Sequence, residues 1–185
     1  MVAVRRHAAN LVTLLRPALA PLFACAVLAA AGGASGWYAA LLFAIVAASD
    51  AIDGRLARHL AITSAAGRAL DHGSDILFLL VALGAYVWIG AAPWWVPAAI
   101  AAAFAAYALD ARWRPDVQPR WLAHRVGHAG GVANYVLVGV LVGNVSVGLG
   151  WIPPAVMAAL FAAVPLYSGW AIAGRLTASA APRRG

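Results

Sequence analysis

Long apolar runs constrain the fold of this chain more than any other feature. Three of them are Ile76–Ala92, Trp94–Leu109 and Ile152–Ala173, which approach or reach the ~20 residues that a helix needs to cross a bilayer. Helices are expected because a segment inside lipid must satisfy its own backbone hydrogen bonds. The composition agrees, since 64% of the residues are hydrophobic, 10% are charged and the mean hydropathy is +0.84. The sequence therefore predicts an all-α polytopic membrane protein with one domain over residues 1–185.

Six membrane spans are expected, separated by short turns that are rich in glycine and proline. Their approximate limits are Asn10–Ala31, Trp37–Arg58, Ser64–Gly90, Trp94–Trp113, Trp121–Asn144 and Pro153–Arg175. The first span has the basic start and the small residues of a signal peptide, but Arg16 and two prolines interrupt it. We therefore expect a retained first helix.

The arginines give the orientation of the spans. All thirteen Lys-plus-Arg residues are arginine, and all fall toward one face of the six-span arrangement. Because basic residues gather on the cytoplasmic side, both termini are expected there, in the inner membrane of a cell. The net charge of +7 does not indicate nucleic acid binding, since the arginines are spread among apolar spans instead of forming one patch.

Carboxylates are concentrated in one short segment. Four of the six acidic residues lie within 26 residues, near the expected cytoplasmic ends of spans two and three. Asp50 and Asp53 share a helix face at i and i+3, and Asp71 and Asp75 share one at i and i+4. A carboxylate inside a span costs about 2.5–3.5 kcal/mol on insertion scales. A network that serves packing alone, neutralised by nearby arginines, is therefore the weaker explanation.

The residue types favour a divalent metal site. Carboxylate oxygens are hard ligands that suit Mg²⁺, Mn²⁺ or Ca²⁺. Zinc is disfavoured because the segment contains no cysteine, and His59 and His72 lie off the two carboxylate faces. Cys25, the single cysteine of the chain, lies in an apolar run and cannot form a disulfide within the chain.

Eight residues of the segment resemble the signature of the CDP-alcohol phosphatidyltransferase family, with every position at the right spacing. They are Asp50, Asp53, Gly54, Ala57, Arg58, Gly67, Asp71 and Asp75. Upstream, Asn10, Thr13 and Arg16 are similar to a short motif of bacterial members. The six-span topology with cytoplasmic termini resembles the family over nearly the whole chain.

The resemblance implies a reaction in which a substituted phosphate passes from a CDP-linked donor to an alcohol, releasing CMP. It also implies two ions of Mg²⁺ or Mn²⁺, held by Asp50, Asp53, Asp71 and Asp75, with Asp75 taking the proton of the attacking hydroxyl. The donor is then expected to contact Gly54, Ala57, Arg58, Gly67, Thr13 and Arg16. Arg125 and Arg112 are the acceptor-side candidates, although a basic loop against anionic lipid headgroups explains that stretch more simply.

The predicted function is transfer of a phosphatidyl group from CDP-diacylglycerol to an alcohol in phospholipid biosynthesis. Short length and the motif ending at Arg16 favour this donor, whereas the segment from Asp71 to Asp75 resembles choline and ethanolamine phosphotransferases, which use CDP-aminoalcohols. A cation-coupled transporter is a further alternative, but it gives no reason for the small residues of the signature. A homodimer is expected because many relatives are dimers.

Polar residues elsewhere in the spans are expected to have structural roles. His128 and Asn134 lie in the fifth span, where interhelical hydrogen bonding explains them better than catalysis does. His72 points off the face shared by Asp71 and Asp75. The tyrosines are expected to be interface anchors or packing residues.

Overall fold

The chain forms an all-α bundle. In this computed structural model the backbone is described for residues 2–60, 65–113 and 121–180, and the side chains for residues 14–49, 70–110, 112 and 129–174. The helices in these ranges are α1 (Val2–Ala31), α2 (Trp37–Leu60), α3 (Ala65–Trp88), α4 (Trp95–Trp113), α5 (Trp121–Leu141) and α6 (Pro154–Ala180). A short π-helix, η1 (Val142–Ser146), continues α5. The predicted all-α fold is confirmed, and each predicted span corresponds to one helix.

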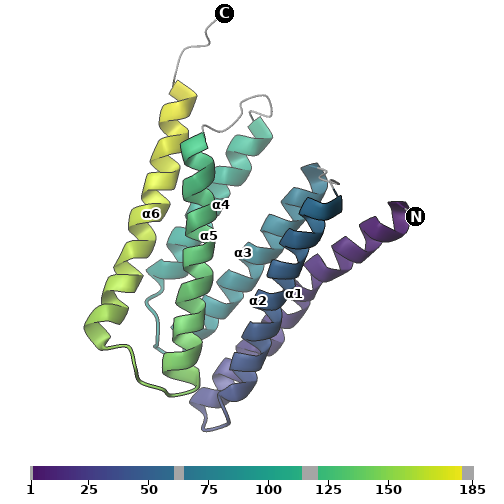
Figure 1. Ribbon diagram of the computed structural model, residues 1–185. Coiled ribbons are helices and arrows are strands. Elements are labelled where there is room, and N and C mark those ends of the chain that lie inside the picture. The colour runs from purple at the N-terminus through teal and green to yellow at the C-terminus, as the bar shows by residue number, and fades with distance from the viewer. Residues whose placement is uncertain (1, 61–64, 114–120, 181–185) are drawn as a thin grey trace, which may run out of the picture.

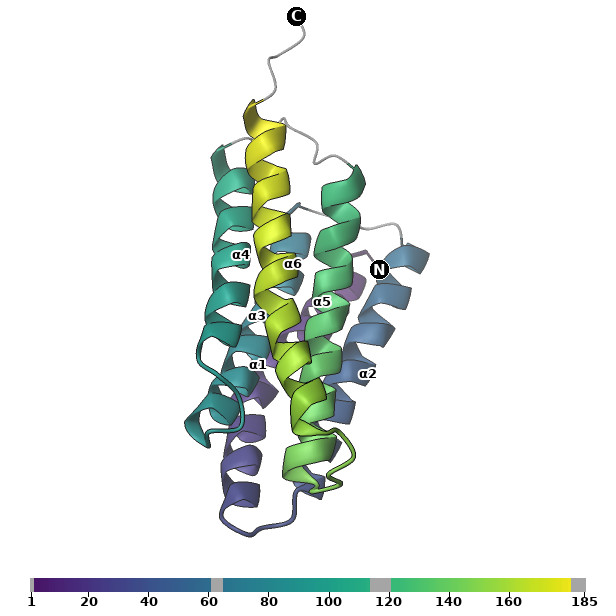
Figure 2. The ribbon, with the colours of Figure 1, turned by 90° about the vertical axis from the view of Figure 1, so that its left-hand side faces the viewer.

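Successive helices run in alternating directions, so the start of α1 and the end of α6 lie at the same end of the bundle (Figures 1 and 2). Helix α1 packs against α2 and α3, and α4 packs against α6 and α3. Helix α5 contacts both α3 and α6, and so connects the helices packed around α1 with the pair formed by α4 and α6.

Glycine ends two of the helices in the same way. Gly33 follows α1 with φ 96°, and Gly90 follows α3 with φ 74°. At each end the glycine N–H donates to the carbonyl three residues back, and the next N–H donates to the carbonyl five residues back, as in Ala34 to Ala29. This pairing satisfies carbonyls at the helix end and needs a residue that tolerates positive φ. These two helix ends lead into the short turns that connect α1 to α2 and α3 to α4.

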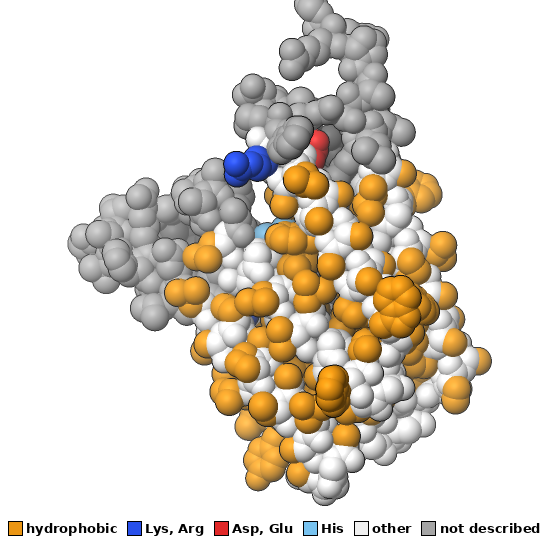
Figure 3. Space-filling view, turned by 180° about the vertical axis from the view of Figure 1, so that it is seen from behind, with side chains coloured by type: hydrophobic (Ala, Val, Ile, Leu, Met, Phe, Trp, Pro, Cys, Tyr) orange, Lys and Arg blue, Asp and Glu red, His pale blue; other side chains and the backbone are white. Residues whose placement is uncertain are grey.

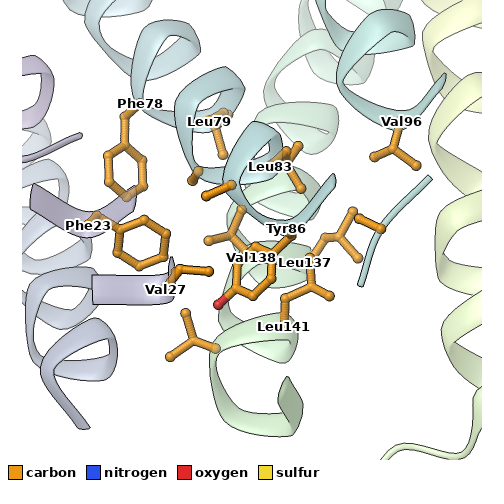
Figure 4. Packing of buried hydrophobic residues seen from close by; sticks show 14 of the residues in the cluster. Phe23, Val27, Phe78, Leu79, Leu83, Tyr86, Val96, Leu137, Val138 and Leu141 are labelled. Atoms are coloured by element: carbon orange, nitrogen blue, oxygen red, sulfur yellow. The ribbon is translucent and has the colours of Figure 1, made fainter. Parts of the chain in front are cut away.

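The buried core lies between α1, α3 and α5 (Figure 4). The ring of Phe23 lies 5.4 Å from that of Phe78 and 6.4 Å from that of Tyr86. Val138 and Leu141 of α5 complete this layer and are fully buried. Aromatic rings at such separations add to the stabilisation that comes from buried area alone.

The outer surface of the bundle is also apolar. Large side chains such as Trp88 (83% exposed) and Leu166 (73% exposed) point away from the core, and hydrophobic side chains cover the face in Figure 3. Within the residues whose side chains the structure describes, four helices contain apolar segments long enough to cross a membrane: Leu14–Ala31, Leu70–Trp88, Ala129–Ser146 and Pro154–Gly174. Shorter apolar segments occupy Trp37–Ser49 and Trp95–Asp110. By helix length and composition this is a multi-pass membrane protein.

Candidate active site

Helix α3 presents two carboxylates on one face at the start of its apolar segment. Asp71 and Asp75 are separated by one helical turn, which places them on the same side of the helix. The Asp71 side chain is 48% exposed and the Asp75 side chain is 21% exposed. The apolar run Ile76–Ala92 begins directly after Asp75, and Arg68 precedes Asp71 in the sequence. Both carboxylates therefore lie near the boundary of the apolar layer, where Asp71 is accessible from outside the protein.

A buried arginine from α1 joins the two carboxylates. The side chain of Arg16 is 0% exposed, and its Nη1 lies 2.9 Å from Oδ1 of Asp71 and 2.5 Å from Oδ1 of Asp75. One nitrogen thus bridges two acidic side chains that repel each other when ionised. Burying a guanidinium is costly unless it is paired and hydrogen-bonded, and the two ion pairs at Nη1 offset part of that cost. Arg16 was predicted to contact the CDP donor, and in this structure its guanidinium contacts Asp71 and Asp75.

A tyrosine of α5 also bonds to the Asp75 carboxylate. The Tyr135 hydroxyl donates to Oδ1 of Asp75 at 3.0 Å. Its ring stacks on Phe78 of α3, with centroids 6.1 Å apart and an interplanar angle of 12°, and lies 6.5 Å from the ring of Phe43 of α2. Oδ1 of Asp75 accordingly accepts bonds from two other helices.

The role of Tyr135 was missed in the sequence, where tyrosines were assigned to packing or interface anchoring. A signal was present, because a tyrosine in the middle of a membrane span carries a hydroxyl that needs a partner away from water. The sequence could not show that this partner is Asp75.

The carboxylate pair fits the donor set of a hard divalent cation. Oδ1 of Asp71 and Oδ1 of Asp75 converge on one positively charged atom, Nη1 of Arg16. Oxygens that converge on a point of positive charge are what Mg²⁺ and Mn²⁺ require. Among the side chains that the structure describes, no group of three or more potential metal ligands occurs. Asp50 and Asp53 lie on α2, and their side chains fall outside that set.

Most of the predicted donor-side and acceptor-side residues likewise lie outside the described side chains. This applies to Thr13 on α1, to Gly54, Ala57 and Arg58 on α2, to Gly67 on α3 and to Arg125 on α5. Their backbones are helical, and their functional assignments stay predictions. Arg112 is described and is exposed in the last turn of α4.

Two polar residues of the spans have the structural roles expected of them. Asn134 of α5 is buried, and its Oδ1 accepts a hydrogen bond from the Tyr167 hydroxyl of α6. The prediction of an interhelical hydrogen bond at Asn134 is confirmed. The His72 ring packs against the rings of Phe104 and Tyr107 on α4, with centroids 5.5 Å and 5.0 Å away. His128 lies outside the described side chains.

The fold and the site together define a multi-pass α-helical membrane protein whose helices hold paired carboxylates at the edge of the apolar layer. A family model for CDP-alcohol phosphatidyltransferase matches residues 6–174, and the chain belongs to this family. It is thus an enzyme that transfers a phosphoryl group from a CDP-linked donor to an alcohol acceptor, as predicted from the signature. The family is generally dependent on divalent metal ions. A comparison with curated proteins finds no match.

Proposed function

We propose that this enzyme transfers a phosphatidyl group from CDP-diacylglycerol to an alcohol and releases CMP, in phospholipid biosynthesis. The observation that supports it best is that the carboxylates of Asp71 and Asp75 on α3 converge on one positively charged atom, Nη1 of Arg16 on α1. The Tyr135 hydroxyl of α5 bonds to Asp75 as well. A nucleotide pyrophosphate approaches two carboxylates readily only through cations. The pair therefore suits a metal-dependent transfer from a CDP-linked donor.

The position of the pair favours a lipid donor. Asp75 comes directly before the apolar run Ile76–Ala92, and Arg68 precedes Asp71 in the sequence. The carboxylates are therefore close to the depth at which lipid headgroups meet the hydrocarbon layer. A donor whose acyl chains stay in the bilayer can place its pyrophosphate at this depth without leaving the membrane. A water-soluble CDP-aminoalcohol has no acyl chains that would hold it at this depth, although its diacylglycerol acceptor has them.

In the proposed reaction the oxygen of the acceptor hydroxyl forms a bond to the phosphorus of the phosphatidyl group. The bond between that phosphorus and the CMP oxygen breaks, and CMP leaves with the bonding electron pair. Asp75 takes the proton of the attacking hydroxyl. Asp50, Asp53, Asp71 and Asp75 would hold two ions of Mg²⁺ or Mn²⁺, which when bound neutralise pyrophosphate charge.

The remaining assignments rest on the family signature and on charge. Gly54, Ala57 and Gly67 let the donor approach the helix backbones, and Arg58 pairs with its phosphate. Thr13 and Arg16 are assigned to the nucleotide or headgroup side of the donor. The Arg16 guanidinium contacts Asp71 and Asp75 in this structure, so any donor contact that it makes is next to that pair. The acceptor lies toward Arg125 and Arg112, which suits a phosphate-bearing alcohol.

We further propose that residues 1–185 form one domain with six spans, both termini and the active site being on the cytoplasmic side of the inner membrane. The arginines support this orientation. The two shorter apolar segments, in α2 and α4, complete the six. A homodimer is the assembly expected of a relative of this kind.

The decisive experiment measures CMP release by the purified protein in nanodiscs with Mg²⁺ and one donor at a time. CDP-diacylglycerol is tested against glycerol 3-phosphate, serine, inositol phosphate and phosphatidylglycerol, and CDP-choline and CDP-ethanolamine are tested with diacylglycerol. We expect turnover with CDP-diacylglycerol and one acceptor. Turnover with a CDP-aminoalcohol alone overturns the choice of donor. Ion flux in proteoliposomes without CMP release from any donor overturns the assignment of this protein as an enzyme.

Conservative variants test the proposed residues in the same assay. Asp71→Asn and Asp75→Asn are each expected to lower kcat by at least about 10²-fold, which is the scale of a lost acid–base group. Asp110→Asn on α4 is the matched control and is expected to keep wild-type turnover. Wild-type activity in both Asp71→Asn and Asp75→Asn would remove the carboxylate pair from the mechanism.

A further inference from the structure

Two donors of different character bond to Asp75 within the part of the chain whose side chains the structure describes. Arg16 is charged, whereas the Tyr135 hydroxyl is neutral, and both bond to Oδ1 of the same carboxylate. A neutral donor keeps its bond when a divalent cation arrives, because it adds no positive charge to the site. A guanidinium is repelled by that cation. Tyr135 is therefore the donor suited to hold Asp75 while the enzyme is loaded with metal.

The surroundings of Tyr135 fix the hydroxyl in place. The ring is stacked on Phe78 from α3 and lies beside Phe43 from α2. These contacts come from two different helices and restrict how the ring turns. A rigid aromatic ring with few rotatable bonds loses little conformational entropy when its hydroxyl forms a hydrogen bond. The bond to Asp75 thus limits the rotation of a carboxylate that is itself 21% exposed.

We propose that Tyr135 is a positioning residue that orients the Asp75 carboxylate for metal binding and for proton transfer, an inference that rests on the proposed function. Partners that hydrogen-bond to metal-binding carboxylates fix their orientation, and their loss typically costs 10–100-fold in metal affinity or activity. The ring alone accounts for the packing against Phe43 and Phe78. The hydroxyl is the part of Tyr135 that acts on Asp75.

Tyr135→Phe separates these two roles because it keeps the ring and removes the hydroxyl. Tyr86→Phe is the matched control: Tyr86 is also a tyrosine of the helix core, and its hydroxyl bonds to Ser146 Oγ at 2.8 Å, near the opposite end of α3. Full-length wild type and both variants are titrated with Mn²⁺, and the free ion is followed by electron paramagnetic resonance. Steady-state CMP release then gives kcat and the donor KM.

The expected result for Tyr135→Phe is about a 10-fold weaker Mn²⁺ affinity and about a 10-fold lower kcat. The donor KM should be unchanged, because the hydroxyl is assigned to Asp75 and not to the donor. Tyr86→Phe should match the wild type in all three quantities. A structural role in packing would not produce a loss of Mn²⁺ affinity confined to one of the two variants.

The outcomes also distinguish this inference from the proposed function. Wild-type Mn²⁺ affinity and kcat in Tyr135→Phe overturn the positioning role and leave the proposed function standing. Equal losses in both tyrosine variants overturn it too, since they indicate a general effect on packing. Mn²⁺ binding by the wild type without CMP release from any donor overturns the proposed function, and the Mn²⁺ titrations alone then decide the role of Tyr135. A wild type that binds no Mn²⁺ overturns both.

Discussion

Arg16 and Asp75 are 59 residues apart in the sequence, and Nη1 of Arg16 lies 2.5 Å from Oδ1 of Asp75 in the structure. The same nitrogen bonds to Asp71, so one fully buried cation neutralises part of the charge of two carboxylates. Divalent ions bound at these carboxylates would supply the positive charge that Arg16 supplies here. The stability of the metal-free protein should consequently depend on Arg16 more than that of the metal-loaded protein does.

Arg16→Met is expected to lower the free energy of unfolding of the metal-free protein by about 3 kcal/mol, because it leaves two carboxylates without their buried partner. Excess Mg²⁺ should restore a large part of the loss. Thermal unfolding in detergent, with EDTA or with Mg²⁺, measures both effects. Arg112→Met, at an exposed arginine of α4, is the control and should change stability by less than about 0.5 kcal/mol. A loss at Arg16 that Mg²⁺ does not alter would contradict the relationship.

The two carboxylates should differ in how much they stabilise the metal-free fold. Asp75 is 21% exposed and accepts bonds from Arg16 and Tyr135, whereas Asp71 is 48% exposed and accepts a bond from Arg16 at 2.9 Å. Asp75→Asn should cost about 2–3 kcal/mol and Asp71→Asn about 1 kcal/mol or less, since exposure screens a charged hydrogen bond. Unfolding in EDTA gives the comparison. The reverse order would indicate that Arg16 depends mainly on Asp71.

The turn before α2 has no room for a side chain at Gly36. A Cβ on Gly36 would overlap the backbone carbonyl of Ser146 at the end of η1, and backbone cannot move aside as a flexible side chain can. Gly36→Ala should therefore destabilise the protein by about 1–3 kcal/mol through overpacking. Gly84→Ala in α3 is the matched control, because nothing lies within 4 Å of its Cβ position. We expect the control to unfold at the wild-type temperature or above it, and equal losses in both variants would refute the contact.

The hydrogen bond between Asn134 and Tyr167 joins α5 to α6 inside the apolar layer. A double-mutant cycle with Asn134→Leu and Tyr167→Phe should give a coupling energy of about 0.6–1.7 kcal/mol, between the average and the largest value typical of such bonds in membranes. The Tyr86 and Ser146 pair provides a second cycle for comparison. A coupling energy of zero for the first pair would mean that the contact adds nothing to the packing of α5 on α6.

Local sequence pattern was sufficient for much of the fold and for one side of the site. Apolar runs and their glycine-rich turns located all six helices, with shifts of a few residues at most ends and a larger one at the start of α1, which begins at Val2 instead of Asn10. The spacing of Asp71 and Asp75 placed them on one face, because the geometry of an α-helix fixes which neighbours share a face. Asn134 was assigned its interhelical role from its polarity alone.

The remaining parts of the site depend on how helices far apart in the sequence are rotated against one another. Arg16 lies in α1 and Tyr135 in α5, and nothing in their local sequence specifies that both side chains turn toward Asp75. Arg16 carried a family-based prediction of donor contact, and Tyr135 resembled a packing residue. The sequence alone determined the helices and the face that bears the carboxylates, since hydrophobicity and helical periodicity are local properties. Tertiary structure decided which cation and which hydroxyl meet them, because that choice depends on the packing of the whole bundle.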